Sequence, residues 1–419
     1  MVEPNSSRDK IGLVLSGGGA RAAYQVGVLQ GIAAVLPRET RLPFPVITGT
    51  SAGAINALGL VGRPGTLRHR TRNLATVWSG LHSGDVYHSD GLAVLKRAAA
   101  IILAMMSPRF ANRRAQSLLD NRPLSKLLSR LIQFDYIDRA LQTNELEAIA
   151  VSAFNYSSGQ STTFFQTHSS KTPWQRFHRQ GVQTIIELSH LLASSALPTL
   201  FPPIEIAGEF FGDGALRQAR PLSPAIHLGA NKLLIIGVTD TAQHQSPTNR
   251  VQQAPSVPQV LGQMLNSVFL DALQADLEQL DQVNRLLLAS SQSTAEDLSS
   301  ALVSRLVISP SESLSSIAVD HFGSLPKSTQ TLLRMTGGMA NQGKNSVLSY
   351  VLFEPSFTRA LIDLGYKDAI RNTESIRNFF AADSATQPPA EPRIGRPLTQ
   401  SNPSSSRLRQ RLLRTIGKS

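Results

Sequence analysis

Hydrophobic and polar positions along the first 60 residues follow the pattern of two strand-plus-helix units. The apolar run KIGLVL at residues 10–15 predicts a short buried strand, and residues 21–36 carry apolar side chains at helical spacing. The run FPVIT predicts a second strand, and residues 52–60 predict a second helix. Two strands that each lead through glycines into a helix indicate a parallel sheet with crossover helices.

The remaining pattern predicts one α/β domain followed by a helical region. The later elements are a strand pair at 147–154 and 161–166, a helix at 183–195, strands at 204–211 and 232–238, and helical patterns at 257–289 and 358–380. We therefore expect an α/β domain over residues 10–238, with a basic helical insertion at about 61–139, after a disordered start at 1–9. A helical C-terminal extension packed on the core is expected over 239–380. The Pro-, Ser- and Arg-rich residues 381–419 predict a disordered basic tail.

The composition narrows the classes of site and of cellular location. The 419 residues include no cysteine, which excludes disulfide bonds and cysteine-ligated metal sites, and the nine histidines show no metal-binding spacing. We expect neither a metal nor a cofactor. The longest apolar run, AAAIILAMM, is shorter than the roughly 20 residues that span a bilayer, and the polar start does not resemble a signal peptide. These features predict a cytoplasmic protein, with a peripheral position on the membrane as an alternative.

The formal net charge of +12 is concentrated in two segments. Residues 61–130 carry twelve Lys and Arg against three Asp and Glu, and residues 385–419 carry seven against one. Such segments favour an anionic membrane surface, while no fold or aromatic platform for nucleic acid is recognised. The last 13 residues fit a basic amphipathic helix on a bilayer or a solvated tail. The apolar stretch at 91–110 fits a lid, an interfacial surface or a core helix.

The stretch GTSAG holds the first candidate for catalysis. Ser51 lies between Gly49 and Gly53, where the second strand turns into a helix, and G-x-S-x-G in this context is typical of a nucleophile elbow. The elbow holds the serine in a strained backbone conformation and leaves its hydroxyl accessible. An ordinary tight turn before a helix of small residues is the alternative.

A glycine loop follows the first strand and has two interpretations. Gly17, Gly18 and Gly19 with Ala22 match G-x-G-x-x-A, the dinucleotide-binding pattern, which also needs an acidic residue at the end of the next strand. Glu39 lies before that strand instead. In the second interpretation, the loop N–H groups and the following helix stabilise an oxyanion, and a serine elbow one strand later is the partner that this requires.

The base that would activate Ser51 is the remaining question. His190 and His227 lie on partly apolar helical stretches where a structural role is expected, and His69, His82 and His88 have no distinguishing context. Asp213 ends a strand-like run between two glycines, which free the backbone to position a short carboxylate. An Asp-Gly turn of a hairpin is the alternative.

The segments SGGGARAAYQVGVLQGI, GTSAGAINAL and SALPTLFPPIEIAGEFFGDGAL, in this order, resemble the patatin-like phospholipases. The resemblance implies a three-layer α/β/α fold with a mainly parallel central sheet. It also implies a Ser-Asp dyad in which Ser51 is the nucleophile and Asp213 the general base. The oxyanion hole would be Gly17, Gly18 and Gly19, and the supporting residues Arg21, Gly49, Gly53 and Gly214. Ala22 stands where many members have glycine.

The resemblance further implies a serine lipid acyl hydrolase, a carboxylic ester hydrolase of phospholipase A or lysophospholipase type. It would cleave acyl esters of membrane phospholipid or lysophospholipid through an acyl-serine intermediate. The alternatives are a non-catalytic lipid-binding or regulatory protein on the same fold and an acyltransferase that uses an acceptor other than water. An aspartate with its usual pKa near 4 is a weak base at neutral pH, so we expect Asp213 to be shielded from water.

Overall fold

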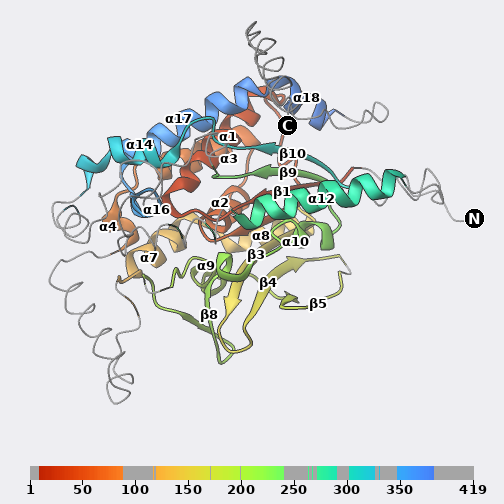
Figure 1. The fold of residues 1–419 in the computed structure, drawn as a ribbon, viewed down its shortest axis with the longest axis horizontal. Coiled ribbons are helices and arrows are strands. Elements are labelled where there is room, and N and C mark those ends of the chain that lie inside the picture. The colour runs from red at the N-terminus through yellow and green to blue at the C-terminus, as the bar shows by residue number, and fades with distance from the viewer. Residues whose placement is uncertain are drawn as a thin grey trace, which may run out of the picture. The chain divides into compact units, whose positions relative to one another are not determined.

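A mainly parallel sheet runs through the described part of the protein, with helices on both faces (Figure 1). The computed structural model describes residues 9–87, 117, 119–169, 171–198, 200–239, 263, 267, 271–289, 302–325, 330 and 347–381. The sheet has ten strands. They are β1 (Ile11–Leu15), β2 (Val46–Thr50), β3 (Ala148–Asn155), β4 (Gln160–Thr167), β5 (Trp174–Arg176), β6 (Arg179–Gln183), β7 (Ile204–Ile206), β8 (Glu209–Asp213), β9 (Lys232–Ile236) and β10 (Ser304–Ile308).

The order of the strands brings two chain segments end to end beside β3. The main order is β10-β9-β1-β2-β3-β4-β6-β5, and the first five of these strands run parallel. Strand β4 pairs with the whole length of β3, whereas β2 pairs only with residues 148–152 of β3. The remaining residues, 153–155, pair with the antiparallel strand β8. Strands β2 and β8 therefore approach each other head to head on the same side of β3.

Alternating side chains of the central strands fill two separate cores, one on each face of the sheet. On β1, Leu13 and Leu15 belong to the larger core, which includes side chains of α1, α2 and α17, while Val14 belongs to the smaller core with α10 and α12. This period of two is what a strand buried on both faces requires. The result is the three-layer α/β/α arrangement that the resemblance implied.

Most of the helices in the described residues contribute side chains to the larger core. The described helices are η1 (Gly19–Ala22), α1 (Ala23–Val35), α2 (Ala52–Val61), α3 (Leu67–Ser79), α4 (Ser83–Val86), α7 (Arg122–Leu131), α8 (Phe134–Gln142), α9 (Leu188–Ser194), η2 (Gly214–Arg217), α10 (Ser223–His227), α12 (Ala272–Ala289), α14 (Leu314–Asp320), η5 (Phe322–Ser324), α16 (Leu348–Val351), α17 (Pro355–Arg371) and α18 (Thr373–Phe380). None of them is both long enough and apolar enough to cross a membrane.

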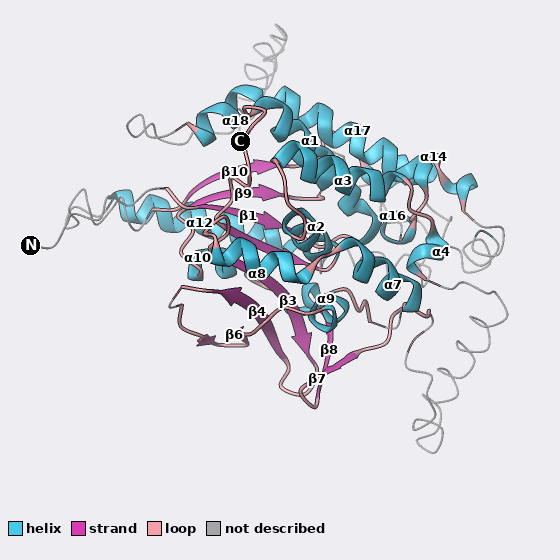
Figure 2. Cartoon of the chain, turned by 180° about the vertical axis from the view of Figure 1, so that it is seen from behind, coloured by secondary structure: helices cyan, strands magenta, loops and turns pink. Residues whose placement is uncertain are grey.

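Helix α17, from the C-terminal region, packs directly on α1 (Figure 2). A Cβ atom added at Gly27 of α1 would lie 2.0 Å from the carbonyl oxygen of Ile362, and one added at Gly365 would lie 2.2 Å from that of Tyr24. The Tyr24 hydroxyl donates to Asp368 at 3.0 Å. Burial and the neighbouring Asp368 raise the pKa of Tyr24 far above its usual value, so this hydroxyl keeps its proton and remains a donor.

The structure agrees with the predicted β1, α1, β2, α2, β3, β4 and β9 and differs in the more irregular parts. The helix predicted at 183–195 begins only at Leu188, because Arg179–Gln183 forms β6. The single strand predicted at 204–211 is a hairpin, β7 and β8, which turns at Ala207 and Gly208. The mainly helical C-terminal region also supplies β10, which extends the sheet beside β9. The stretch at 91–110, His88, the start at 1–8 and the tail from 382 lie outside the described residues.

Candidate active site

Ser51 occupies a strained turn between β2 and α2. Its backbone angles are φ 54° and ψ −129°, in a region that residues other than glycine rarely adopt. The backbone N–H of Ser51 donates to the Ser194 hydroxyl at 2.9 Å, and that hydroxyl donates to the carbonyl of Ser152 at 2.6 Å. The strained turn is thus tied to α9 and, through it, to β3, as expected for the predicted elbow.

Asp213 meets Ser51 from the opposite direction, because β8 ends where β2 ends. On β3, Thr50 pairs with Ser152 and Asp213 pairs with the next residue, Ala153. The Ser51 hydroxyl donates to Asp213 Oδ2 at 2.5 Å, and the backbone N–H of Ala215 donates to Oδ1 at 2.9 Å. A separation of 2.5 Å is typical of a hydroxyl bonded to a charged carboxylate. The sheet register therefore brings the two predicted dyad residues into direct contact.

Burial makes the Asp213 carboxyl a much stronger base than a free aspartate. The residue is 1% exposed, and this loss of hydration raises its pKa from 3.8 to about 7. The hydrogen bonds from Ser51 and from the backbone of Ala215 favour the charged form and offset part of the rise. A base with a pKa near neutrality is suited to proton transfer at neutral pH.

The glycine loop after β1 lies beside Ser51. Gly19 has φ +55°, and an added Cβ would lie 2.2 Å from the carbonyl oxygen of Tyr350, so both its conformation and its surroundings require glycine. Gly19 and Ser51 line the same cavity, whereas Gly17 and Gly18 are buried beside it and do not line it. Three further predicted glycines, Gly49, Gly53 and Gly214, lie where an added Cβ would come within 2.1 to 2.6 Å of backbone atoms.

Arg21 is fully buried and faces the C-terminal region of the chain. Its guanidinium donates to the hydroxyl of Ser349 at 2.9 Å and to that of Ser315 at 2.8 Å. It also lies 4.2 Å from the ring centre of Tyr350. Its Nη1 atom has no hydrogen-bond partner in the described part of the chain. Arg21 thus attaches the start of the glycine loop's helix to α14 and α16, an arrangement suited to ordering the loop.

The candidate histidines are engaged elsewhere. The Nδ1 atom of His190 accepts from the backbone N–H of Glu187, and its ring packs against Phe164. The ring of His227 stacks on Trp174. Burial lowers the pKa of both imidazoles. These contacts agree with the structural roles expected from the sequence.

An apolar cavity of about 50 Å³ adjoins Ser51. Its lining comes from the elbow, from α2, α3, α4, α7 and α16, and from the chain after α9. The lining residues are Gly19, Ser51, Ala52, Ile55, Val77, Trp78, Leu81, Val86, Tyr87, Leu124, Leu127, Leu128, Leu131, Ser195, Leu197, Phe201, Tyr350, Val351 and Phe353. Such a lining favours hydrocarbon groups over polar ones, because they bury apolar area without leaving polar groups unpaired.

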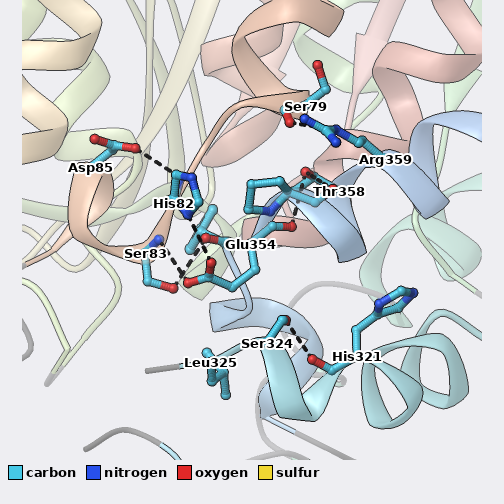
Figure 3. A network of polar contacts seen from close by, with 12 residues as sticks. Ser79, His82, Ser83, Asp85, His321, Ser324, Leu325, Glu354, Thr358 and Arg359 are labelled. Atoms are coloured by element: carbon cyan, nitrogen blue, oxygen red, sulfur yellow. Dashed lines mark hydrogen bonds and ion pairs between the residues drawn. The ribbon is translucent and has the colours of Figure 1, made fainter. Parts of the chain in front are cut away.

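A cluster of polar contacts follows the cavity-lining residues Leu81 and Phe353 in the chain (Figure 3). It consists of His82, Ser83 and Glu354, and we call it the α4–α17 clasp. The buried Glu354 carboxylate accepts from the Ser83 backbone N–H at 3.3 Å and lies 3.2 Å from His82 Nδ1. The Ser83 hydroxyl donates to the carbonyl of Phe353 at 3.3 Å. The clasp thereby holds α4 against the chain segment just before α17.

Several residues of the site carry no recognisable signal in the sequence. The Thr50 hydroxyl donates to Gln218, whose side-chain amide donates to the Ser152 hydroxyl at 3.0 Å. These residues and Ser194 support the elbow from β2, β3, α9 and the end of η2, but isolated Ser, Thr and Gln residues are common everywhere in a chain. Among the described residues, no group of three or more His, Asp or Glu side chains is arranged to hold a metal ion.

Comparisons with known proteins agree with the geometry of the site. The family model of patatin-like phospholipase matches residues 13–226, about half of the chain, and this range contains the glycine loop, Ser51 and Asp213. The cGAMP-activated phospholipase of Vibrio cholerae is 28% identical in an alignment of 231 residues, and the match covers 51% of this chain and 56% of that protein. The chain thus matches little more than half the length of this relative.

Among solved structures, VipD from Legionella pneumophila aligns over 89% of this chain and 69% of its own. The sequence identity is 14% and the TM-score is 0.35, too low to bear on the fold. The family assignment rests on the family model, whose match spans the strained serine turn, the buried aspartate and the glycine loop together. On this match, the chain belongs to the patatin-like phospholipase family.

Proposed function

We propose that this protein is a serine lipid acyl hydrolase of phospholipase A or lysophospholipase type, with Ser51 and Asp213 as its catalytic dyad. The observation that carries the proposal is the 2.5 Å hydrogen bond from the Ser51 hydroxyl to a buried carboxylate, beside an apolar cavity. Membership of a phospholipase family supports the same class of reaction.

In the first half of the reaction, the Asp213 carboxylate accepts the Ser51 proton while Oγ attacks the carbonyl carbon of the lipid ester. The resulting oxyanion is stabilised by backbone N–H groups of the loop Gly17, Gly18 and Gly19, and by the start of the helix that follows. When the intermediate collapses, the bond to the alcohol oxygen breaks, and this oxygen takes the proton from Asp213. The lyso-lipid or glycerol alcohol leaves, and the acyl group remains on Ser51.

In the second half, Asp213 accepts a proton from water, and the hydroxyl oxygen attacks the acyl-serine carbonyl. The second tetrahedral intermediate expels Ser51 Oγ, which recovers its proton from Asp213, and the fatty acid is released. Each proton that Asp213 accepts is thus returned within the same half-reaction. A pKa of about 7 allows both directions of transfer near neutral pH.

The acyl chain would occupy the cavity beside Ser51, and the protein would act on the membrane as a peripheral enzyme. The basic segments 61–130 and 385–419 are proposed to favour an anionic membrane surface. Within the first segment, Arg70 does not contribute, because it is buried and donates to Glu145 at 2.8 Å. The contribution of that segment therefore falls on its more exposed cations, such as Arg72, Lys126 and Arg130.

Labelling with a fluorophosphonate probe, together with turnover of p-nitrophenyl esters and of phospholipid vesicles, tests the proposal. Wild-type protein is expected to label and to release fatty acid, and Ser51→Ala to do neither. Ser195→Ala is the matched control, since Ser195 also lines the cavity but its hydroxyl donates to the carbonyl of Leu191. It should label like the wild type.

Other outcomes would point to the alternative functions. A wild type that neither labels nor turns over, even with vesicles present, would favour a lipid-binding protein. Labelling with acyl transfer to an added alcohol, and little release of free fatty acid, would favour an acyltransferase.

A further inference from the structure

Three aromatic side chains are exposed at neighbouring turns of the sheet. Tyr156 follows β3 and is 44% exposed, Phe177 lies in the β5–β6 turn and is 86% exposed, and Phe210 lies on β8 and is 44% exposed. We call these three residues the aromatic rim. Exposed apolar residues that gather on one part of a surface mark sites of interaction with proteins or membranes, whereas single ones are common.

Backbone hydrogen bonds bring the three turns together. The N–H of Tyr156 donates to the carbonyl of Phe210 at 2.9 Å, and the N–H of Ser161, on β4, donates to that of His178, next to Phe177, also at 2.9 Å. Because β6 is the second strand from β3, the turns of β3–β4 and β5–β6 are separated by about 10 Å across the sheet. In Figure 2 the β3–β4 and β7–β8 hairpins reach the same end of the sheet.

The aromatic rim lies at the same edge of the sheet as the candidate dyad. Strand β3 is parallel to β2 and extends three residues past the level of Thr50, so its end projects about 10 Å beyond that level. Strand β8 runs back from there to Asp213. A surface that touched the aromatic rim would therefore face the edge where Ser51 lies.

Tyr156 also connects the aromatic rim to the site directly. Its ring covers Gly212, the neighbour of Asp213, where an added Cβ would lie 2.6 Å from the Tyr156 hydroxyl oxygen. Burial and then the charge of Asp213 raise the pKa of Tyr156. A second connection runs through Leu197 and Phe201, which line the cavity beside Ser51, since β7 begins three residues after Phe201.

Positive charge accompanies the most exposed aromatic side chain. Arg176 and Arg179 pair across the β5–β6 hairpin on either side of Phe177. Burial lowers the pKa of Arg179, as do the like charges of Arg220 and Arg176, and Asp276 opposes this only in part. Cations beside an exposed aromatic group suit the head-group region of a bilayer, where aromatic rings and anionic phosphates are both available.

We propose that the aromatic rim is a membrane-docking surface, in which Phe177, Phe210 and Tyr156 enter the interfacial layer of a phospholipid bilayer and Arg176 and Arg179 contact its phosphates. Docking at this edge turns the end of the sheet that carries Ser51 and Asp213 toward the membrane. None of these five residues belongs to the basic segments 61–130 and 385–419. The biological role of this docking rests on the proposed lipid hydrolysis, but docking itself requires no catalysis.

Vesicle binding of the full chain with Ser51→Ala, measured by sedimentation, tests the surface without interference from hydrolysis. Neutral phosphatidylcholine vesicles at high salt minimise the contribution of the basic segments, because charge interactions are screened. In this background, Phe177→Ala with Phe210→Ala should weaken binding by roughly tenfold per aromatic ring. Ile185→Ala is the matched control, since Ile185 is 70% exposed and follows β6 at the opposite end of that strand. It should bind like the parent.

A second arm uses vesicles that contain anionic phosphatidylglycerol at low salt. Arg176→Gln with Arg179→Gln should weaken binding there and have little effect on neutral vesicles. The proposal is overturned if the parent protein does not bind neutral vesicles, if the double aromatic variant binds as the parent does, or if Ile185→Ala weakens binding equally. It is also overturned if the aromatic substitutions act by dissociating a dimer, which sedimentation equilibrium would detect. Vesicle binding and catalysis are tested separately. If wild-type protein does not react with the fluorophosphonate probe, the proposed hydrolase function is contradicted, but the binding measurements on the Ser51→Ala background still decide whether the aromatic rim docks on membranes.

Discussion

Replacement of Asp213 by asparagine separates the cost of burying a charge from its catalytic use. The carboxylate is buried, and its pKa in the folded protein, about 7, lies well above the value of 3.8 for a free side chain. Between these two values the folded protein binds more protons at this position than the unfolded chain does. The contribution of Asp213 therefore destabilises the fold increasingly as the pH rises from about 4 to about 7.

The size of the effect follows from the two pKa values. A shift from 3.8 to about 7 corresponds to a cost of about 2 kcal/mol at pH 5 and about 4 kcal/mol at pH 8. Asparagine has the same shape and stays neutral, so it removes this cost. We expect Asp213→Asn to be more stable than wild type at both pH values, with an advantage about 3 kcal/mol larger at pH 8.

The same substitution should abolish activity although it stabilises the fold. The dyad needs the carboxylate, so the wild-type kcat/KM for a soluble ester should rise about tenfold per pH unit below 7 and level off above it. Asp213→Asn should lack this activity at every pH. The same mutation thus stabilises the fold and removes function, a trade-off that is common at active sites.

The assay is chemical denaturation from pH 5 to pH 8, with ester turnover measured in parallel. Ser51→Ala is the control, because it removes the hydroxyl hydrogen bond that favours the charged carboxylate and should raise the pKa of Asp213 further. An Asp213→Asn variant that is less stable than wild type at pH 8, or whose advantage does not grow with pH, would refute the reasoning.

Three further predictions concern the support of the elbow and the walls of the cavity. Ser194→Ala leaves the buried N–H of Ser51 without the hydroxyl that accepts from it, so we expect a loss of about 1–3 kcal/mol in unfolding free energy together with a lower kcat; unchanged values of both would contradict the role of Ser194. Leu127→Phe places more volume on the wall of a cavity of about 50 Å³. The substitution should lower kcat/KM for palmitoyl esters by roughly tenfold relative to butyryl esters, since one methylene group in a hydrophobic pocket is worth about 1–3 kcal/mol. Equal effects on both chain lengths would argue against binding of the acyl chain in this cavity. Glu354→Ala opens the α4–α17 clasp and should change KM for long-chain esters several-fold while short-chain esters are unaffected, whereas a melting temperature and a chain-length profile like those of wild type would show that the clasp does not hold the wall.

Much of the fold could be predicted from the sequence where the signal is local. Strand β1 and helix α1 are confirmed within two residues, since their apolar periodicity depends only on neighbouring positions. Short edge strands could not be predicted, because they depend on pairing with a distant strand and not on the pattern of adjacent residues. Strand β5 has three residues and β10 has five, with a solvent-facing and irregular pattern, and both exist because a neighbouring strand offers them hydrogen bonds.

Some residues of the candidate site could likewise be recognised from local patterns, and others could not. The strained turn at Ser51 and the left-handed glycine at position 19 are properties of a few adjacent residues, so their motifs could be recognised directly. A glycine-flanked aspartate is different, because an Asp-Gly turn and a catalytic aspartate have the same local pattern. The resemblance to a family singled out Asp213, whereas its residues alone left both interpretations open.

The sequence by itself determined the order of the central elements, the two glycine-framed turns and the positions of the chemically capable side chains. The tertiary structure decided what those side chains meet. It brought β8 to the end of β2 on one side of β3, so that Asp213 contacts Ser51 and, being buried there, has a raised pKa. It also buried Arg21 against α14 and α16 and gathered an apolar cavity from residues as distant as Gly19 and Phe353. Backbone turns are set by adjacent residues, whereas burial, charge and proximity depend on which distant segments pack together.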